Sequence, residues 1–121
     1  MTPFDFRLLL DLAERLLTDD SDEAIVRTVI NRIYYAAFNV AREVVAQDEQ
    51  VSNHRVHDRV WRWYVDHEAG LPMERLGHIG FRLSRMRRQA DYDATATLTV
   101  RDARRALRAA RRLIESISEI H

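Results

Sequence analysis

The sequence predicts an all-α protein, a compact bundle of about five helices. Apolar residues recur at helical spacing over several long segments, and no segment alternates between apolar and polar residues as a half-buried strand would. The 121 residues include three glycines and two prolines, so breaks between elements are few. A hydrophobic fraction of 46% is enough to fill one core, and we expect a single domain over residues 1–121.

The first two helices are expected over residues 3–18 and from about residue 21 to residue 48. Thr2 can cap the first helix, with Pro3 at its first position, and Asp20 or Ser21 can cap the second. The second helix is apolar over most of its circumference, which predicts a central position. Its apolar residues are Val26, Val29, Ile30, Ile33, Tyr34, Ala37, Phe38, Val40, Ala41, Val44 and Val45.

Three more helices are expected after residue 50. Ser52 or Asn53 begins one that ends at Gly70, and the "GLP" break precedes another over residues 73–90. The stretch "DYDATATL" is interpreted as a loop. Thr99 and Asp102 have the spacing of a capping box, with Asp in place of Glu, and predict the start of the last helix.

The composition excludes several classes of site. The chain has no cysteine, hence no disulfide and no thiolate ligand or nucleophile. It has no glycine-rich phosphate loop and no serine-hydrolase or HExxH motif, and the His54, His57 and Asp58 group has too few ligands for a metal site. We therefore expect no metal and no cofactor. The N-terminus lacks a signal peptide pattern and no apolar run is long enough to span a membrane, so a cytoplasmic location is expected.

Charge is balanced overall but unevenly placed. Residues 1–50 carry 5 arginines and 10 acidic residues, whereas residues 51–121 carry 14 arginines and 9 acidic residues. All 19 basic residues are arginine, which fits a compositional bias. The asymmetry indicates either an anionic partner for the second half or one half packing on the other. The basic face of the last helix (Arg101, Arg104, Arg105, Arg108, Arg111 and Arg112) fits nucleic-acid binding and a solvated helix face equally.

A polar stripe on the second helix is the first candidate site. Asn31, Arg32, Tyr35 and Asn39 fall on one side of the helix at 100° per residue. A tyrosine and two asparagines are unusual choices for a merely solvated helix face. The stripe therefore predicts a groove or an interface, with an exposed polar face as the alternative.

Arg87 is the second candidate. It lies beside the apolar stripe of the fourth helix, with Asp91 four residues later and with Arg85 and Arg88 as neighbours. An arginine at the edge of a buried face needs an anionic partner. That partner is either Asp91 or a bound phosphate, to which the guanidinium fork is matched.

These residues resemble a known family. "NRIYYAAFNVARE" in a long helix, a histidine in "SNHRVHDRVW" (His54), and "MRRQADYD" near the end of the fourth helix are together similar to small prokaryotic members of the HEPN superfamily. The resemblance covers most of the chain from the second helix onward. It implies an up-and-down helical bundle, often a homodimer, and in many members a metal-independent endoribonuclease. Some members are toxins paired with a nucleotidyltransferase-like antitoxin, and others act in defence or bind RNA or nucleotides without cutting.

The chain departs from the ribonuclease motif at one position. Arg87 matches the motif arginine, but Tyr92 stands where the resemblance places the motif histidine. A tyrosine, with a typical pKa of about 10, exchanges protons poorly near neutral pH. An ionised Asp91 beside Arg87 is a weak base. If the chain is catalytic, we expect Arg87, Asp91 and Tyr92 to be the catalytic residues.

The sequence thus predicts a protein that binds RNA or a nucleotide and belongs to a toxin–antitoxin or defence locus. Asn31, Arg32, Tyr35, Asn39, His54, Arg85 and Arg88 are expected to line its binding site. The alternative is a non-enzymatic protein–protein interaction module, such as a dimeric helical adaptor. A helix-turn-helix DNA-binding protein ranks last, because no short helix pair with exposed base-reading residues is present.

Overall fold

The computed structural model describes residues 2–48, 56–66 and 70–120. These residues form five helices and no strand, which confirms the predicted all-α bundle. The helices are α1 (Arg7–Leu16), α2 (Glu23–Asp48), α3 (Val56–Asp66), α4 (Leu71–Tyr92) and α5 (Val100–Ile120).

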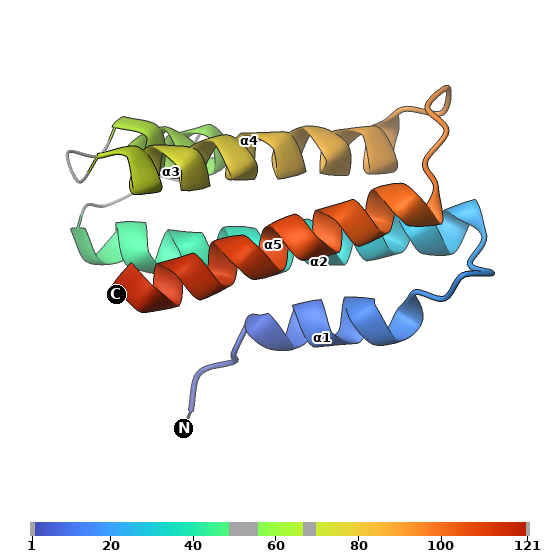
Figure 1. Ribbon diagram of the computed structural model, residues 1–121, viewed down its shortest axis with the longest axis horizontal. Coiled ribbons are helices and arrows are strands. Elements are labelled where there is room, and N and C mark those ends of the chain that lie inside the picture. The colour runs from blue at the N-terminus through green and yellow to red at the C-terminus, as the bar shows by residue number, and fades with distance from the viewer. Residues whose placement is uncertain (1, 49–55, 67–69, 121) are drawn as a thin grey trace.

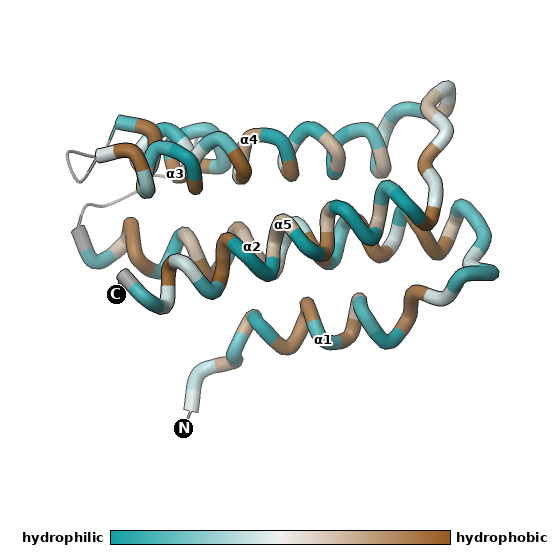
Figure 2. The backbone as a smooth tube through the Cα atoms, in the orientation of Figure 1, coloured by the Kyte–Doolittle hydropathy of each residue, from teal (hydrophilic) through white to brown (hydrophobic). Residues whose placement is uncertain are grey.

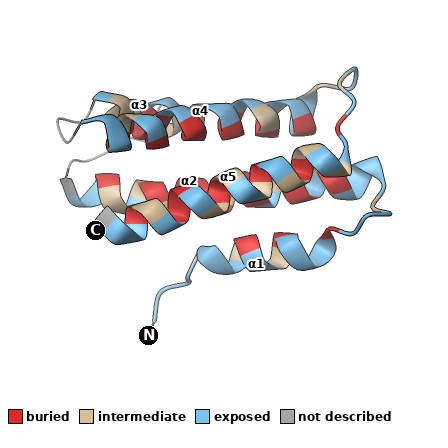
Figure 3. Cartoon of the chain, in the orientation of Figure 1, coloured by how far each residue is buried: buried red, intermediate tan, exposed pale blue. Residues whose placement is uncertain are grey.

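Helix α2 is the centre of the bundle, as predicted. It contacts each of the other four helices. Figure 1 shows α2 and α5 side by side in the middle, with α3 and α4 on one side and α1 on the other. The buried residues lie on the helix faces that turn toward one another (Figure 3), and hydrophilic segments dominate the outer faces (Figure 2). The predicted stripe of α2 is buried, except that Val40 and Val44 are half-buried.

The first two helices begin later than predicted. Helix α1 starts at Arg7, whose backbone N–H donates to the Asp5 carboxylate at 3.0 Å, so the expected cap at Thr2 and helix start at Pro3 were wrong. Helix α2 is capped by Asp22, whose Oδ1 accepts the Ile25 backbone N–H at 2.9 Å. Neither Asp20 nor Ser21 makes this bond. Several acceptors in a row compete for one cap, and the packing of the connection selects among them.

The later helix ends were predicted with mixed success. The capping box of α5 is confirmed. The Thr99 backbone N–H donates to the Asp102 carboxylate at 2.9 Å, and the Asp102 backbone N–H donates to the Thr99 hydroxyl at 3.2 Å. Helix α4 starts at Leu71, with Pro72 in its first turn, and extends to Tyr92. The expectation that Asp91 and Tyr92 lie in a loop was therefore wrong. The expected start of the third helix, at Ser52 or Asn53, falls outside the described residues, as do residues 67–69, which precede its expected end at Gly70.

Two glycines let α3 and α4 approach closely. A Cβ atom on Gly80 would lie 2.0 Å from the Trp61 ring, and one on Gly77 would lie 2.8 Å from the Trp61 carbonyl oxygen. Trp61 is itself fully buried. This close packing fixes the position of α3, which carries His57, against the rest of the bundle.

The charge asymmetry is partly explained inside the chain. Arg104 of α5 pairs with Asp19 at 2.5 Å, and Arg111 pairs with Glu14 of α1. The acidic first half thus packs against the basic second half, which is one of the two predicted explanations. In the described part of the chain, no helix is long and apolar enough to cross a membrane.

Candidate functional site

Arg87 lies on the inner side of α4 and is only 9% exposed. Its guanidinium carbon is 5.4 Å from the ring centre of Tyr34, 5.7 Å from that of Tyr35 and 6.0 Å from that of Tyr92. Aromatic faces attract a cation through the ring quadrupole, more strongly when water is excluded. The surroundings of this buried cation are therefore more aromatic than acidic.

The carboxylate beside Arg87 is shared with α2. Arg87 Nη1 lies 3.4 Å from Asp91 Oδ2, which is long for a charge-assisted hydrogen bond. The Asn31 amide donates to both oxygens of the same carboxylate, at 3.1 and 3.3 Å. Arg87 Nε and Asn31 Oδ1 are buried and find no partner among the described residues. A buried donor without a partner is costly, so the described residues leave this cation partly unsatisfied.

The end of α4 is held in place by Arg27 of α2. Its guanidinium donates to the carbonyl oxygens of Gln89 at 3.1 Å, Ala90 at 3.2 Å and Ala96 at 2.6 Å. Carbonyls at a helix C-terminus lack partners within the helix, and an arginine can satisfy them. This link extends α4 through Asp91 and Tyr92 and fixes both beside Arg87.

A histidine from α3 joins the same group. The Tyr34 hydroxyl lies 2.7 Å from His57 Nδ1 and accepts a hydrogen bond from Trp61 Nε1 at 3.1 Å. The His57 ring stacks on Phe38 with 4.1 Å between ring centres, and it meets Tyr35 edge-on at 5.9 Å. His57 and the Arg87 guanidinium thus both lie within 6 Å of the Tyr34 and Tyr35 ring centres.

The environment keeps this histidine neutral. Burial lowers the pKa of His57, and the positive charge of Arg87 lowers it further. Burial raises the pKa of the Tyr34 hydroxyl, which therefore stays protonated. A neutral imidazole keeps a nitrogen lone pair that can accept a proton, and the lowered pKa makes it a weaker base than an exposed histidine.

The structure brings some of the predicted site residues together. Asn31, Tyr35, Arg87, Asp91 and Tyr92 meet where α2 faces the end of α4. With Tyr34 and His57 they form what we call the Arg87 cluster. Tyr92 is the outermost member, with 78% of its surface exposed.

The other predicted residues lie at or beyond the edge of this cluster. Asn39 donates to the Tyr35 carbonyl oxygen at 2.8 Å, and Arg32 is exposed. Arg88 is exposed but close enough for its charge to lower the pKa of His57. Arg85 is exposed and points away from Arg87, since two residues turn a helix by about 200°. His54 falls outside the described residues.

Sequence reasoning missed two members of the cluster and the arginine that supports it. Tyr34 was assigned to the core, His57 was considered only as a metal ligand, and Arg27 was not singled out. Within the described residues, no three His, Asp or Glu side chains gather in a group that could hold a metal ion. The only local signal for His57 was its position four residues before Trp61, on the same face of α3.

One of three comparisons with known proteins identifies a family for the chain. A search of curated proteins and a search of solved structures each found no match to the chain. The model of the HEPN domain family matches residues 8–120, which is nearly the whole chain. This match includes every described member of the Arg87 cluster, and the chain therefore belongs to the HEPN domain family.

Proposed function

We propose that the chain binds RNA, or a nucleotide, through a phosphate held at the Arg87 cluster. The observation that carries this proposal is a buried arginine with an unpartnered Nε and only a long contact to a carboxylate. A guanidinium presents its donors as a fork that matches two phosphate oxygens. Tyr92, exposed beside this cation, offers a face on which a base can stack.

We propose further that the cluster supports slow RNA cleavage without a metal ion. The Tyr34 hydroxyl oxygen accepts from Trp61 Nε1 and lies 2.7 Å from His57 Nδ1, so it would also accept a hydrogen bond from a proton carried on Nδ1. In that tautomer His57 Nε2 is free to act as a base. It would take the proton of a ribose 2′-hydroxyl, and the 2′-oxygen would attack the adjacent phosphorus. The leaving 5′-oxygen would take a proton from the imidazolium, and a 2′,3′-cyclic phosphate would remain.

Arg87 has a separate part in this reaction. Negative charge grows on the phosphate oxygens as the 2′-oxygen attacks, and a fixed guanidinium in a dry site stabilises it. Asp91 would orient Arg87 as its carboxylate partner, and Asn31 would hold that carboxylate in place. His57 would thus supply the proton transfer that Tyr92, at the motif position, performs poorly.

The resemblance to HEPN proteins supports a proposal for the biological setting. We propose that the protein acts in a toxin–antitoxin or defence locus, as a homodimer with a nucleotidyltransferase-like antitoxin as its partner. A nucleotidyltransferase-like gene beside this one would support that setting. The absence of such genes and of defence genes from the neighbourhood in several genomes would count against it.

The test of activity is incubation of end-labelled RNA with the protein in EDTA. The wild type should produce fragments that end in 2′,3′-cyclic phosphate. Arg87→Ala and His57→Asn should each lose them, whereas Arg85→Ala, which removes the same charge two residues away, should keep them. Equal traces from all four proteins would indicate a contaminant and overturn the cleavage proposal. Binding without cutting, weakened only in Arg87→Ala, would leave the binding proposal standing.

The alternative function is a protein–protein interaction module. Four of the charges available for pairing between copies are already used within the chain, in the ion pairs of Arg104 with Asp19 and of Arg111 with Glu14. Salt distinguishes the two functions, because RNA affinity falls steeply as salt rises when phosphate contacts dominate. RNA binding that is absent, or insensitive to salt, would favour the interaction module.

A further inference from the structure

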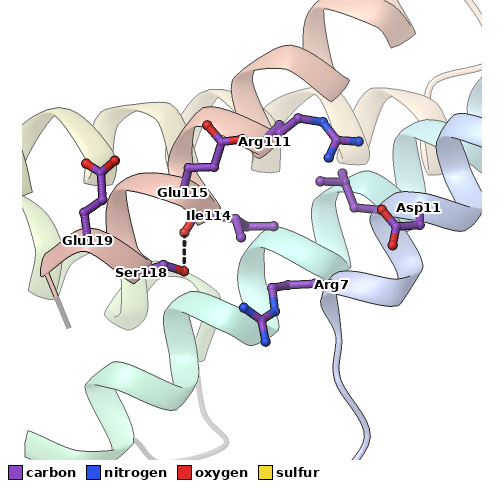
Figure 4. Close-up of a pocket in the computed structure, with 8 residues that line it drawn as sticks. Arg7, Asp11, Arg111, Ile114, Glu115, Ser118 and Glu119 are labelled. Atoms are coloured by element: carbon purple, nitrogen blue, oxygen red, sulfur yellow. Dashed lines mark hydrogen bonds between the residues drawn. The ribbon is translucent and has the colours of Figure 1, made fainter.

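A groove between α4 and α5 lies apart from the Arg87 cluster. It has a volume of about 700 Å³, and it is bordered at one end by the loop that joins the two helices. Its floor is aliphatic, with Leu83 and Ala106 buried and Met86 and Ala109 half-buried. A second hollow, between α1 and α5 (Figure 4), is lined by both signs of charge and selects no class of ligand.

The rim of the α4–α5 groove is strongly basic. Arg82 stands on the α4 side, and Arg105, Arg108 and Arg112 stand along the α5 side. The one acidic residue of the lining, Asp102, is already bound by Thr99 and Arg105. No carboxylate of the described residues forms an ion pair with Arg82, Arg108 or Arg112. The groove therefore offers an apolar floor bordered by three arginines without an ion pair among the described residues, and by Arg105, which is bound to Asp102.

These features favour a protein ligand over a nucleic acid. Sites for single-stranded RNA combine positive charge with aromatic rings on which bases stack. None of the residues that line this groove is aromatic. An aliphatic floor offers no hydrogen bond to a phosphate or to the edge of a base. An amphipathic helix, in contrast, places aliphatic residues on one face and charges along its borders, and it binds grooves between helices in this way.

The dimensions of the groove set the form of the ligand. The α4 wall extends from Ile79 to Gln89, which is about 15 Å or three turns of helix. Arg105, Arg108 and Arg112 recur at i, i+3 and i+7, so the charges of one α5 edge line up with acidic residues at the same spacing on a ligand helix. We propose that the α4–α5 groove binds an amphipathic helix of a partner protein that carries aliphatic residues flanked by Asp and Glu.

The test uses the full chain and a fluorescein-labelled synthetic helix of about three turns. One peptide has leucines on one face and glutamates along its borders, a second has lysines in place of the glutamates, and a third has serines in place of the leucines. Fluorescence anisotropy should show binding of the first peptide alone. Binding of the lysine or serine peptide with equal affinity would overturn the proposal.

Two variants of the protein locate the contact. Arg105→Glu/Arg108→Glu should weaken the binding at least about tenfold, which corresponds to 1.4 kcal/mol. Ala109→Trp should weaken it by filling the floor without any change of charge. Arg75→Glu/Arg101→Glu makes the same charge change at exposed positions outside the groove and should change the affinity less than about twofold, as typical surface charges do.

Three results would contradict the inference. The two double variants would weaken binding equally if only net charge mattered. Labelled RNA would displace the peptide, and the groove variants would lose RNA affinity, if the groove served nucleic acid. A lower mass of the groove variants in light scattering would make a second copy of the chain the occupant. None of these measurements depends on the Arg87 cluster or on cleavage.

Discussion

Arg87 was recognisable from sequence because helix geometry fixes the direction of a side chain. Its angle beside Leu83 predicted a half-buried position, and the structure buries it with Asp91 at 3.4 Å. His57 was not recognisable, because its contact with Tyr34 depends on how α3 packs against α2. Residues on one helix can be related by spacing, whereas residues on two helices meet only through tertiary packing.

The titration of His57 gives a prediction for stability. Burial and Arg87 lower its pKa in the folded protein, so below the ordinary value of about 6.5 the unfolded chain binds the proton more readily. The free energy of unfolding should therefore be highest above that pH and fall as the pH drops toward the pKa of the folded state. Urea denaturation of the wild type and of His57→Asn, at pH 7.5 and 5.5, measures this.

The variant separates His57 from the other titrating groups. His57→Asn retains a polar group near the Tyr34 hydroxyl but removes the titrating ring and its stacking on Phe38, so the two proteins are compared by their change in stability with pH. The loss of stability between the two pH values should be smaller in the variant than in the wild type. An equal loss in both proteins would show that His57 does not titrate with a lowered pKa.

At the scale of the elements, the sequence predicted which segments are helical but not always where they end. The α5 start was predicted because a capping box is a local arrangement of two side chains. The α4 end was not, because the helix is extended by Arg27, which lies 62 residues away from Gln89 in sequence. Local signals predict local bonds, and long-range bonds then move the boundaries.

The capping box of α5 should stabilise the protein measurably. Thr99→Ala removes the hydroxyl that accepts the Asp102 N–H, and loss of such a cap typically costs about 1 kcal/mol. Thr97→Ala, at an exposed threonine of the same loop, is the matched control and should change stability by less than about 0.5 kcal/mol. Equal effects of the two substitutions on the urea midpoint would show that the box contributes nothing specific.

Replacing a glycine of α4 by alanine should destabilise the protein, which is the opposite of the usual effect in a helix. Alanine normally stabilises a helix relative to glycine by up to about 1 kcal/mol. At Gly80 the added Cβ would lie 2.0 Å from the buried Trp61 ring, and overpacking of this kind costs about 1–3 kcal/mol. Gly80→Ala should therefore lower the melting temperature. A raised melting temperature would mean that α3 and α4 are not packed this closely.

The whole molecule is a neutral protein whose charges are segregated. Two ion pairs, Arg104 with Asp19 and Arg111 with Glu14, connect the basic second half of the chain to the acidic first half. Four further arginines line the α4–α5 groove, and no member of the Arg87 cluster belongs to that lining. The arginines of α5 thus have two different environments: some form ion pairs within the chain and others line the groove. The sequence alone did not distinguish these two groups.

The proposed homodimer is tested by mass. We expect light scattering at micromolar concentration to give twice the mass of the chain, since Tyr92, exposed at the edge of the Arg87 cluster, leaves that cluster open to a second copy. The mass should not change with moderate salt if the contact is mainly apolar. A single-chain mass over the whole concentration range would exclude paired sites and leave each Arg87 cluster to act alone.

The central claim, that Arg87 holds a phosphate, is tested most directly at its own Nε–H group. In the nitrogen–proton spectrum this signal is assigned by its disappearance in Arg87→Lys. Addition of a 2′-O-methyl RNA oligonucleotide, which lacks the attacking hydroxyl and cannot be cut, should shift the Arg87 signal, because its unpartnered Nε gains an acceptor. Shifts confined to exposed arginines such as Arg82 and Arg85, with the Arg87 signal unmoved at saturation, would contradict the claim.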